Sequence, residues 1–445
     1  MKKLLPILIT AVMAGWFLNT LRPPQEESFA FSEFGKLPIL SSGRVQPIDS
    51  LARNSLMQIR HVQEANLEPW KGMSGKPRII SATEWLANVM MNPAVADDWP
   101  VFRVDNQELI SLLKLPGKDL TQHQDGEHYS WNQIQPALQS FGPESDRIEK
   151  IAASQRNAYE KSVVKMRDRI FLYLQLKNAV QPGDAENWSQ ELKEYEKVIP
   201  AGVAALQAEQ AKQKYDEAVL SQLAGFVERF RAMSNFEPPL VVPPLAPDLA
   251  RNAWKRTGDV LIETLRDEKA DPSVHAYAAM GAALQAGDAA EFNRQLVQYR
   301  SDLVPRFSAE LRKARWEVFF NRMQPFYNAM VIYILAALLA FLFWFNLSES
   351  LRSSAVWLIG LALAIHTTGL IFRMVLEGRP PVTNLYSSAI FIGFGAVVLG
   401  LILERFYRNG IGAVVASGIG FITLIIAHHL AFTGDTMEMM QAVLD

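Results

Sequence analysis

Four long apolar segments in the C-terminal third constrain this chain more than any other feature. They cover residues 326–345, 355–376, 385–403 and 411–432, and short polar turns separate them. Each is close to the roughly 20 residues that an α-helix needs to cross about 30 Å of hydrocarbon at a rise of about 1.5 Å per residue. Apolar segments of this length are unusual in the core of a soluble protein. The sequence therefore predicts four membrane-spanning helices.

A further apolar segment, residues 4–21, follows Lys2 and Lys3 at the start of the chain. It fits either a cleaved signal peptide or an uncleaved anchor, and the small residues of 28–30 keep cleavage open. We favour the anchor, because the segment is about long enough to span a membrane with little tilt. The predicted fold class is then an all-α membrane protein. It combines a transmembrane bundle of about five spans with a large, mainly α-helical extracytoplasmic region.

Differences in composition along the chain predict three domains. Residues 1–24 are the anchor or signal segment, 25–325 form the extracytoplasmic region, and 326–445 form the four-span membrane domain. The prolines of residues 237–247 fix φ and lack amide donors, so this segment is expected to be a stiff extended connector. Apolar residues at a helical period predict one long amphipathic helix over 145–180. Further predicted elements are a helix over 85–91, a strand over 99–104, one or two helices within 184–233, and helices over 248–266, 272–286 and 288–323.

Basic residues in the short loops predict the orientation in the membrane. The N-terminal lysines place that end of the chain in the cytoplasm, so an uncleaved first span leaves residues 25–325 outside. Loops 346–354 and 404–410 then lie inside, and both contain arginine as the rule requires. Arg373 and Arg379 fall on the outer side, against the rule, and therefore need a separate explanation.

The composition excludes several classes of site. The chain has no cysteine, which rules out disulfides, thiolate metal sites, iron–sulfur clusters and a covalent c-type haem on this chain. A formal net charge of −2 argues against nucleic acid as a partner. We find no Ser/His/Asp arrangement, no zinc-protease motif and no phosphate loop, so no enzyme active site is predicted.

His366, Gly369 and Arg373 give the strongest candidate site. An ionisable residue in the middle of a span is expensive and is a functional candidate by default. The three residues share one helix face, with the imidazole deep in the membrane and the guanidinium near the outer surface. That face suits a flat apolar ligand with anionic groups at one edge, such as haem. The alternatives are that His366 only makes a hydrogen bond between helices, and that Arg373 and Arg379 extend to lipid headgroups.

The loop after this span ends its helix and begins the next. Pro380 and Pro381 forbid a continuing helix, and Asn384 and Tyr386 open the following span. Arg379, Asn384 and Tyr386 are therefore candidates to bind the anionic edge of the same ligand. The alternative is a plain interhelical turn with an interfacial tyrosine.

The remaining histidines are weaker candidates. His428 and His429 lie near the outer end of the last span, but neighbouring helical residues point about 100° apart, so the two cannot bind one metal from the same side. They are interfacial polar residues, or else His428 faces the bundle. His123 and His128 enclose Asp125 and Glu127, which predicts a polar loop rather than a metal site.

Small residues recur at Gly412, Ala416 and Gly420 in the last apolar segment. Small residues four apart allow two helices to approach closely in a membrane. We therefore expect this face to pack against a neighbouring helix.

Residues 326–445 resemble the cytochrome c assembly family of CcsA/ResC type, which is related to the CcmC and CcmF haem-handling proteins. Met374 and Ser387 depart from the family pattern, which has Trp and Glu there. Residues 36–40 and 43–52 resemble the start of the extracytoplasmic region in some bacterial fused assembly proteins. The residues that match the family pattern are His366, Gly369, Leu370, Arg373, Gly378, Pro381, Asn384, Leu385, Tyr386 and Ser388.

The resemblance implies a transiently bound haem b. The candidate cofactor-binding residues are His366, Arg373, Asn384 and Tyr386, which match the family pattern, and Arg379, which lies in the same loop; His366 and His428 are the candidate ligands of the iron by residue type and position. The tryptophan-rich outer loop of the family, which histidines flank, has no counterpart in this sequence. The chain is thus expected to be the front part of a split or truncated protein, or to work with a separately encoded second half.

The resemblance further implies a System II cytochrome c biogenesis component in the bacterial inner membrane, with residues 25–325 in the periplasm. It would deliver or present haem to apocytochrome c, beside a ResB/CcsB-like membrane partner and lipid. It would not be an enzyme alone, but part of a haem lyase or cytochrome c synthase complex. The alternative is a membrane-anchored extracytoplasmic scaffold that docks the assembly complex and has no haem site of its own.

Overall fold

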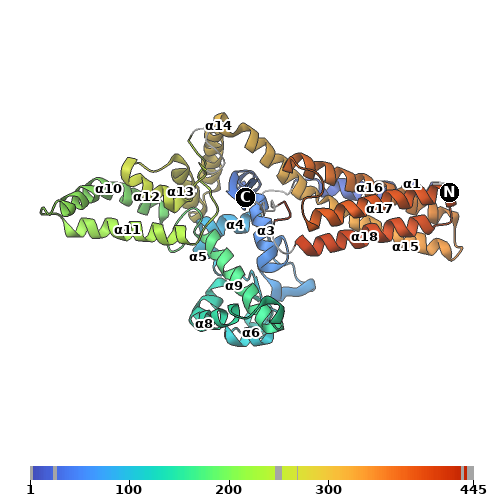
Figure 1. Ribbon diagram of the computed structural model, residues 1–445, viewed down its shortest axis with the longest axis horizontal. Coiled ribbons are helices and arrows are strands. Elements are labelled where there is room, and N and C mark those ends of the chain that lie inside the picture. The colour runs from blue at the N-terminus through green and yellow to red at the C-terminus, as the bar shows by residue number, and fades with distance from the viewer. Residues whose placement is uncertain (1–3, 24–27, 246–252, 268, 432–434, 438–445) are drawn as a thin grey trace. The chain divides into compact units, whose positions relative to one another are not determined.

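The computed structural model describes residues 4–23, 28–245, 253–267, 269–431 and 435–437 (Figure 1). The chain divides into two compact units. The membrane unit comprises Met1–Gln25, Ser42–Arg44 and Arg312–Asp445, and the polar unit comprises Glu26–Ser41 and Val45–Leu311. Among the described residues helices dominate, and the strands form three short two-stranded pairs. The predicted all-α membrane fold class is confirmed.

Four apolar helices of the membrane unit run side by side, and the N-terminal helix α1 packs along α16 (Figure 1). By length and hydropathy the described chain has four segments able to cross a membrane, which are α16, α17, α18 and the apolar part of Ala289–Trp344 that forms α15. Each of the four predicted spans thus forms a helix long and apolar enough to cross a membrane, whereas α1 has only 16 residues and its span stays a prediction. The bounds are α1 (Leu5–Thr20), α15 (Pro325–Trp344), α16 (Glu349–Glu377), α17 (Leu385–Tyr407) and α18 (Ile411–Leu430).

Small residues set the distance between α17 and α18. A Cβ atom on Gly400 would lie 2.7 Å from the Cβ of Ala416, and one on Gly420 would lie 2.8 Å from Val397. One on Gly412 would lie 2.5 Å from the carbonyl oxygen of Gly400. The expected close packing of this small-residue face is therefore confirmed.

The polar unit is built around α4 (Ala82–Met91), whose residues are almost all buried. This helix packs against α3, α9 and α13, while α10, α11 and α12 pack on one another in turn (Figure 1). The strand pairs are β1–β2, β3–β4 and β5–β6, with Ala65 opposite Ile80 and Phe102 opposite Tyr129 in the latter two. The helices are α2 (Phe31–Phe34), α3 (Ile48–Arg60), α5 (Pro93–Ala96), α6 (Gln107–Leu112), α7 (Trp131–Ile134), α8 (Leu138–Glu149), α9 (Ala158–Lys177), α10 (Trp188–Gln210), α11 (Glu217–Asn235), α12 (Thr257–Asp267), α13 (Pro272–Gln285) and α14 (Ala289–Met323). Helix α14 has a kink at Phe307, and its residues from Arg312 onward belong to the membrane unit. The short elements are β1 (Pro38–Ser41), β2 (Arg44–Pro47), β3 (Glu64–Asn66), η1 (Pro69–Ser74), β4 (Ile79–Ser81), β5 (Phe102–Arg103), η2 (Leu120–Gln122), β6 (His128–Tyr129), η3 (Gln135–Ala137) and η4 (Ala153–Gln155).

The prediction of one long helix over 145–180 is wrong. Helix α8 ends at Glu149, and α9 begins only at Ala158. Asn157 caps α9 by accepting from the amide of Glu160, whose side chain bonds back to the Asn157 amide. This reciprocal cap fixes an extended conformation at its first residue, so the helix cannot continue through it.

The described part of the proline-rich connector, residues 237–245, contains no helix. It makes two isolated bridges, Leu40 to Leu240 and Val242 to Lys255. The helix expected from residue 248 begins at Thr257, and residues 246–252 lie outside the described chain.

The environment of His61 predicts that the stability of the polar unit depends on pH. It ends α3 in the left-handed region, and burial with the charges of Arg169 and Arg103 lowers its pKa from 6.5 to about 4. The Nη2 atom of Arg169 lies 2.6 Å from His61 Nε2, which must accept and therefore be unprotonated. Neutral His61 thus contributes stability above pH 6.5, and this contribution is lost as the pH falls toward 4.

Between pH 7 and pH 4.5 the parent protein is expected to lose about 1–2 kcal/mol more unfolding free energy than His61→Asn. Asparagine tolerates the left-handed conformation and does not titrate. Hydrogen exchange of the α3 and α9 amides at several pH values measures the difference. An equal dependence of unfolding free energy on pH in parent and variant would contradict the assignment of this effect to His61.

Candidate functional site

His366 lies on α16 with its side chain fully buried in the membrane unit. Three aromatic rings surround the imidazole, at centroid distances of 5.7 Å for Phe326, 6.2 Å for Tyr333 and 6.1 Å for Phe394. These residues come from α15 and α17, so three helices define the environment of one imidazole. Water is excluded from this ring by apolar side chains.

The two ring nitrogens of His366 differ. Nδ1 lies 3.4 Å from the hydroxyl oxygen of Tyr333. Nε2 is buried and has no hydrogen-bond partner of normal geometry among the described residues, although the ring lies near the backbone of Ile390. Leaving a buried polar atom unsatisfied costs about 1–3 kcal/mol, so such an atom needs an explanation. A bound ligand is one explanation, and a weak hydrogen bond of the ring to the backbone of Ile390 is the other.

Gly369 supplies the small residue on the same face. A Cβ atom there would lie 2.9 Å from the ring of Phe326 and 2.9 Å from Pro325. The glycine therefore lets the start of α15 approach α16 next to His366.

Arg373 is buried rather than extended to the surface. Its Nη2 atom lies 2.6 Å from a carboxylate oxygen of Glu377, one turn later on α16, and its guanidinium carbon lies 4.8 Å from the ring centroid of Tyr386. It also donates to the carbonyl oxygen of Thr436 at 2.9 Å and to its hydroxyl at 3.4 Å. Pairing with Glu377 explains a buried arginine on the side of the bundle where basic residues were not expected.

Asn384 caps α17 and also contacts Thr436, the residue to which Arg373 donates. Its side-chain oxygen accepts from the amide of Ser387 at 2.8 Å, and the Ser387 hydroxyl oxygen accepts from the Asn384 amide at 2.9 Å. Serine thus performs the capping role at the position where the family pattern has glutamate. The Nδ2 atom of Asn384 donates to the carbonyl oxygen of Thr436 at 3.1 Å.

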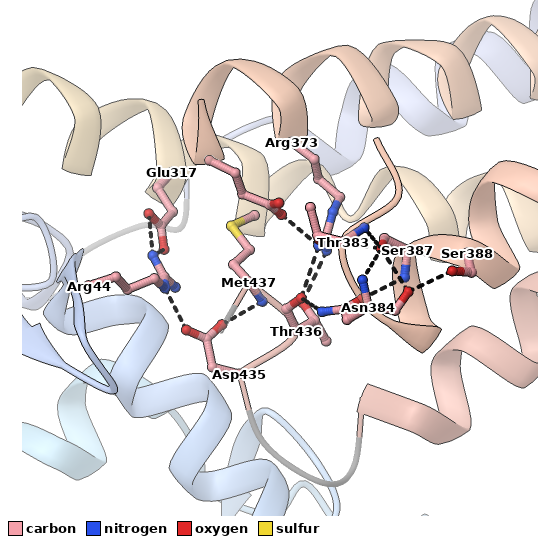
Figure 2. Close-up of polar contacts among 11 residues, drawn as sticks. Arg44, Glu317, Arg373, Thr383, Asn384, Ser387, Ser388, Asp435, Thr436 and Met437 are labelled. Carbon is pink, nitrogen blue, oxygen red and sulfur yellow. Dashed lines mark hydrogen bonds and ion pairs between the residues drawn. The ribbon is translucent and has the colours of Figure 1, made fainter. Parts of the chain in front are cut away.

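Three charged residues of the membrane unit, Arg44, Glu317 and Asp435, pair with one another and were not identified from the sequence. Figure 2 shows Arg44 between Glu317 and Asp435. Its guanidinium lies 2.9 Å from Glu317 and 2.6 Å from Asp435, and both carboxylates are almost fully buried. Burial lowers the pKa of Arg44, but these two charges outweigh it and raise the pKa above its usual value. No local pattern could reveal this, because Arg44 and Asp435 are 391 positions apart.

The other candidates lie elsewhere or are exposed. Arg379 is exposed after the end of α16. His428 is half-buried with its ring 6.2 Å from Tyr327, and the Nδ1 atom of exposed His429 lies 2.9 Å from the carbonyl oxygen of Ile425.

His123 and His128 lie in a polar loop, as predicted. The Nδ1 atom of His128 lies 2.6 Å from Asp125, while His123 stacks on Trp70. Within the described ranges no three His, Cys, Asp or Glu side chains are arranged to hold a metal ion.

The chain is similar to two known proteins, one of which is named for cytochrome c biogenesis. It is 32% identical over 93 residues to the cytochrome c biogenesis protein CcsA of Prochlorococcus marinus, covering 20% of this chain and 30% of that protein. It is 22% identical over 440 residues to Protein NrfI of Wolinella succinogenes, covering 93% of this chain and 39% of that protein. No family model matches the sequence. The chain spans between 30% and 39% of the length of these relatives, and the two similarities point to the cytochrome c biogenesis family.

Proposed function

We propose that this chain is a membrane component of cytochrome c biogenesis that binds haem and takes part in its delivery to apocytochrome c outside the cytoplasm. The observation behind the proposal is the buried Nε2 atom of His366, which has no partner of normal geometry among the described residues. The similarity to cytochrome c biogenesis protein CcsA supports it. Imidazole nitrogen commonly binds haem iron, so a haem would satisfy this atom.

The residues fit such a cofactor by their chemistry. When bound, haem supplies the iron and the porphyrin that the pathway attaches to its target. With Nδ1 of His366 protonated and donating to the hydroxyl of Tyr333, the lone pair of Nε2 would be left for the iron. Arg373 lies two helical turns away, about 10 Å along the axis, and with Arg379 and Asn384 would bind the propionates.

The setting of this activity follows the same family. We propose System II biogenesis in a bacterial inner membrane, with residues 25–325 in the periplasm. Apocytochrome c would be the acceptor, and a ResB/CcsB-like partner or a separately encoded second half would complete the machinery. Haem b would be held only transiently. On this proposal the chain contributes to a haem lyase or cytochrome c synthase complex.

His366→Ala is expected to reduce haem occupancy of the purified full-length chain at least tenfold, because it removes the imidazole proposed to bind the iron. Tyr333→Phe should lower haem affinity about 10-fold, through loss of the group that orients the ring. The Soret absorbance after expression with haem supplementation measures both. His429→Ala provides the matched control, since His429 is exposed on another helix. Full occupancy in His366→Ala would refute this site, and a loss in His428→Ala instead would move it to α18.

One observation favours the alternative of an extracytoplasmic scaffold. The polar unit has its own continuous hydrophobic core, which runs from Phe34 to Leu311 without residues of the membrane unit. A scaffold needs such a unit but needs no haem ligand. Unchanged haem occupancy and normal cytochrome c formation in His366→Ala and Arg373→Gln would favour this alternative.

A further inference from the structure

The segment Asp435–Met437 is held by the membrane unit at three points (Figure 2). The Asp435 carboxylate pairs with Arg44 at 2.6 Å. The carbonyl oxygen of Thr436 accepts from both Arg373 and Asn384. The Met437 side chain is only 6% exposed and belongs to the apolar core of the unit.

This segment occupies Arg373 and Asn384, two of the three side chains that the proposed function assigns to the carboxylates of haem. Both donor nitrogens of Arg373 that meet Thr436, and the single side-chain amide of Asn384, point at the segment. A carboxylate cannot use the same nitrogens in the same geometry while Thr436 is in place. Binding of an anionic ligand edge through these N–H groups of Arg373 and Asn384 therefore requires Thr436 to leave.

The contacts of Thr436 and Asp435 differ in kind, and this difference favours replacement of Thr436 by a carboxylate. Arg373 and Asn384 now donate to a neutral carbonyl oxygen, whereas a carboxylate would bring a full negative charge to the Arg373 guanidinium and a charged acceptor to Asn384. The Arg44–Asp435 contact is itself an ion pair between two nearly buried groups and anchors the segment from the other side. The segment is thus held by an ion pair at Asp435 and by hydrogen bonds to a neutral group at Thr436.

We propose that Asp435–Met437 is a latch, anchored by the Arg44–Asp435 ion pair, which a carboxylate-bearing ligand displaces from Arg373 and Asn384. The inference rests on the proposed function, because it takes the propionates of haem as the competing carboxylates. The latch makes access to Arg373 depend on a residue that does not touch the ligand. Asp435 is accordingly a positioning residue.

The absence of cysteine allows a direct test in the full-length protein in detergent. Met437→Cys introduces a single thiol that is buried while the latch is closed, so its modification by a maleimide reports opening. Adding Asp435→Asn is expected to accelerate modification at least tenfold. Asp105→Asn, which changes an exposed aspartate of the polar unit, is the matched control and should leave the rate unchanged. An equally slow rate in Asp435→Asn would overturn the latch.

The second arm uses haem and haem dimethyl ester, which lacks free carboxylates. Haem is expected to accelerate modification of the introduced thiol several-fold and the ester to have no effect, while Asp435→Asn should bind haem several-fold more tightly than the parent. Haem binding that leaves the modification rate unchanged would overturn the latch and leave the proposed function standing. Absence of haem binding in every variant would overturn the proposed function, and with it the competition inferred here.

Discussion

Glu404→Ala is expected to lower the unfolding free energy of the membrane unit by about 3–5 kcal/mol, the range for removing one partner of a buried ion pair. The Glu404 side chain is only 2% exposed. Its carboxylate accepts from Arg352 at 2.9 Å and from the backbone amides of Gly410 and Ala413 at 3.2 and 3.3 Å. These amides belong to the start of α18, where helical N–H groups have no partner of their own.

One carboxylate therefore satisfies two kinds of donor at once. Alanine would leave the amides of α18 unsatisfied inside the bundle, and Arg352 would keep only Glu349 as an acidic partner among the groups described. Glu404→Gln retains an acceptor for the amides but loses the charge, so its loss should be smaller, about 1–3 kcal/mol.

Glu349→Ala is the matched control. Glu349 pairs with the same Arg352 at 3.2 Å, but its side chain is 75% exposed, so its removal should cost less than about 1 kcal/mol. Denaturation of the full-length protein by sodium dodecyl sulfate in mixed micelles measures all three. Equal losses for Glu404→Ala and Glu349→Ala would show that burial of Glu404 does not stabilise the bundle.

The membrane unit was predictable because lipid imposes a length and a polarity on each helix. The apolar segments 326–345 and 411–432 match α15 (Pro325–Trp344) and α18 (Ile411–Leu430) within two residues. The shared face of His366 and Arg373 followed from helical geometry in the same way. In the polar unit, the break before α9 carried a visible signal, since Asn157 and Glu160 have the spacing of a capping box.

The surroundings of the candidate site were less predictable. The Arg373–Glu377 pair is spaced i, i+4 and could have been inferred from the sequence. The Arg44–Asp435 pair could not, because only the tertiary fold brings the start of β2 next to a segment beyond the last span. Local patterns therefore identified the proposed ligand-facing residues but not the groups that already occupy them.

Gly412→Ala is expected to destabilise the membrane unit by about 3 kcal/mol or more, because overpacking against backbone cannot be relieved by a side-chain rotation. A Cβ atom on Gly412 would lie 2.4 Å from the amide nitrogen of Glu404 and 2.5 Å from the carbonyl oxygen of Gly400. Both atoms belong to the backbone of α17, so α17 and α18 would have to separate.

Gly418→Ala, in the same helix, is the matched control. No atom lies within 4 Å of a Cβ placed there, and alanine favours a helix over glycine by about 1 kcal/mol, so this variant should be neutral or slightly stabilised. Similar denaturation midpoints for the two variants would refute close packing at Gly412.

Separating the helices at Gly412 also pulls the Glu404 carboxylate away from the amides of α18. The double variant Gly412→Ala/Glu404→Ala should therefore lose less unfolding free energy than the sum of the losses in the two single variants.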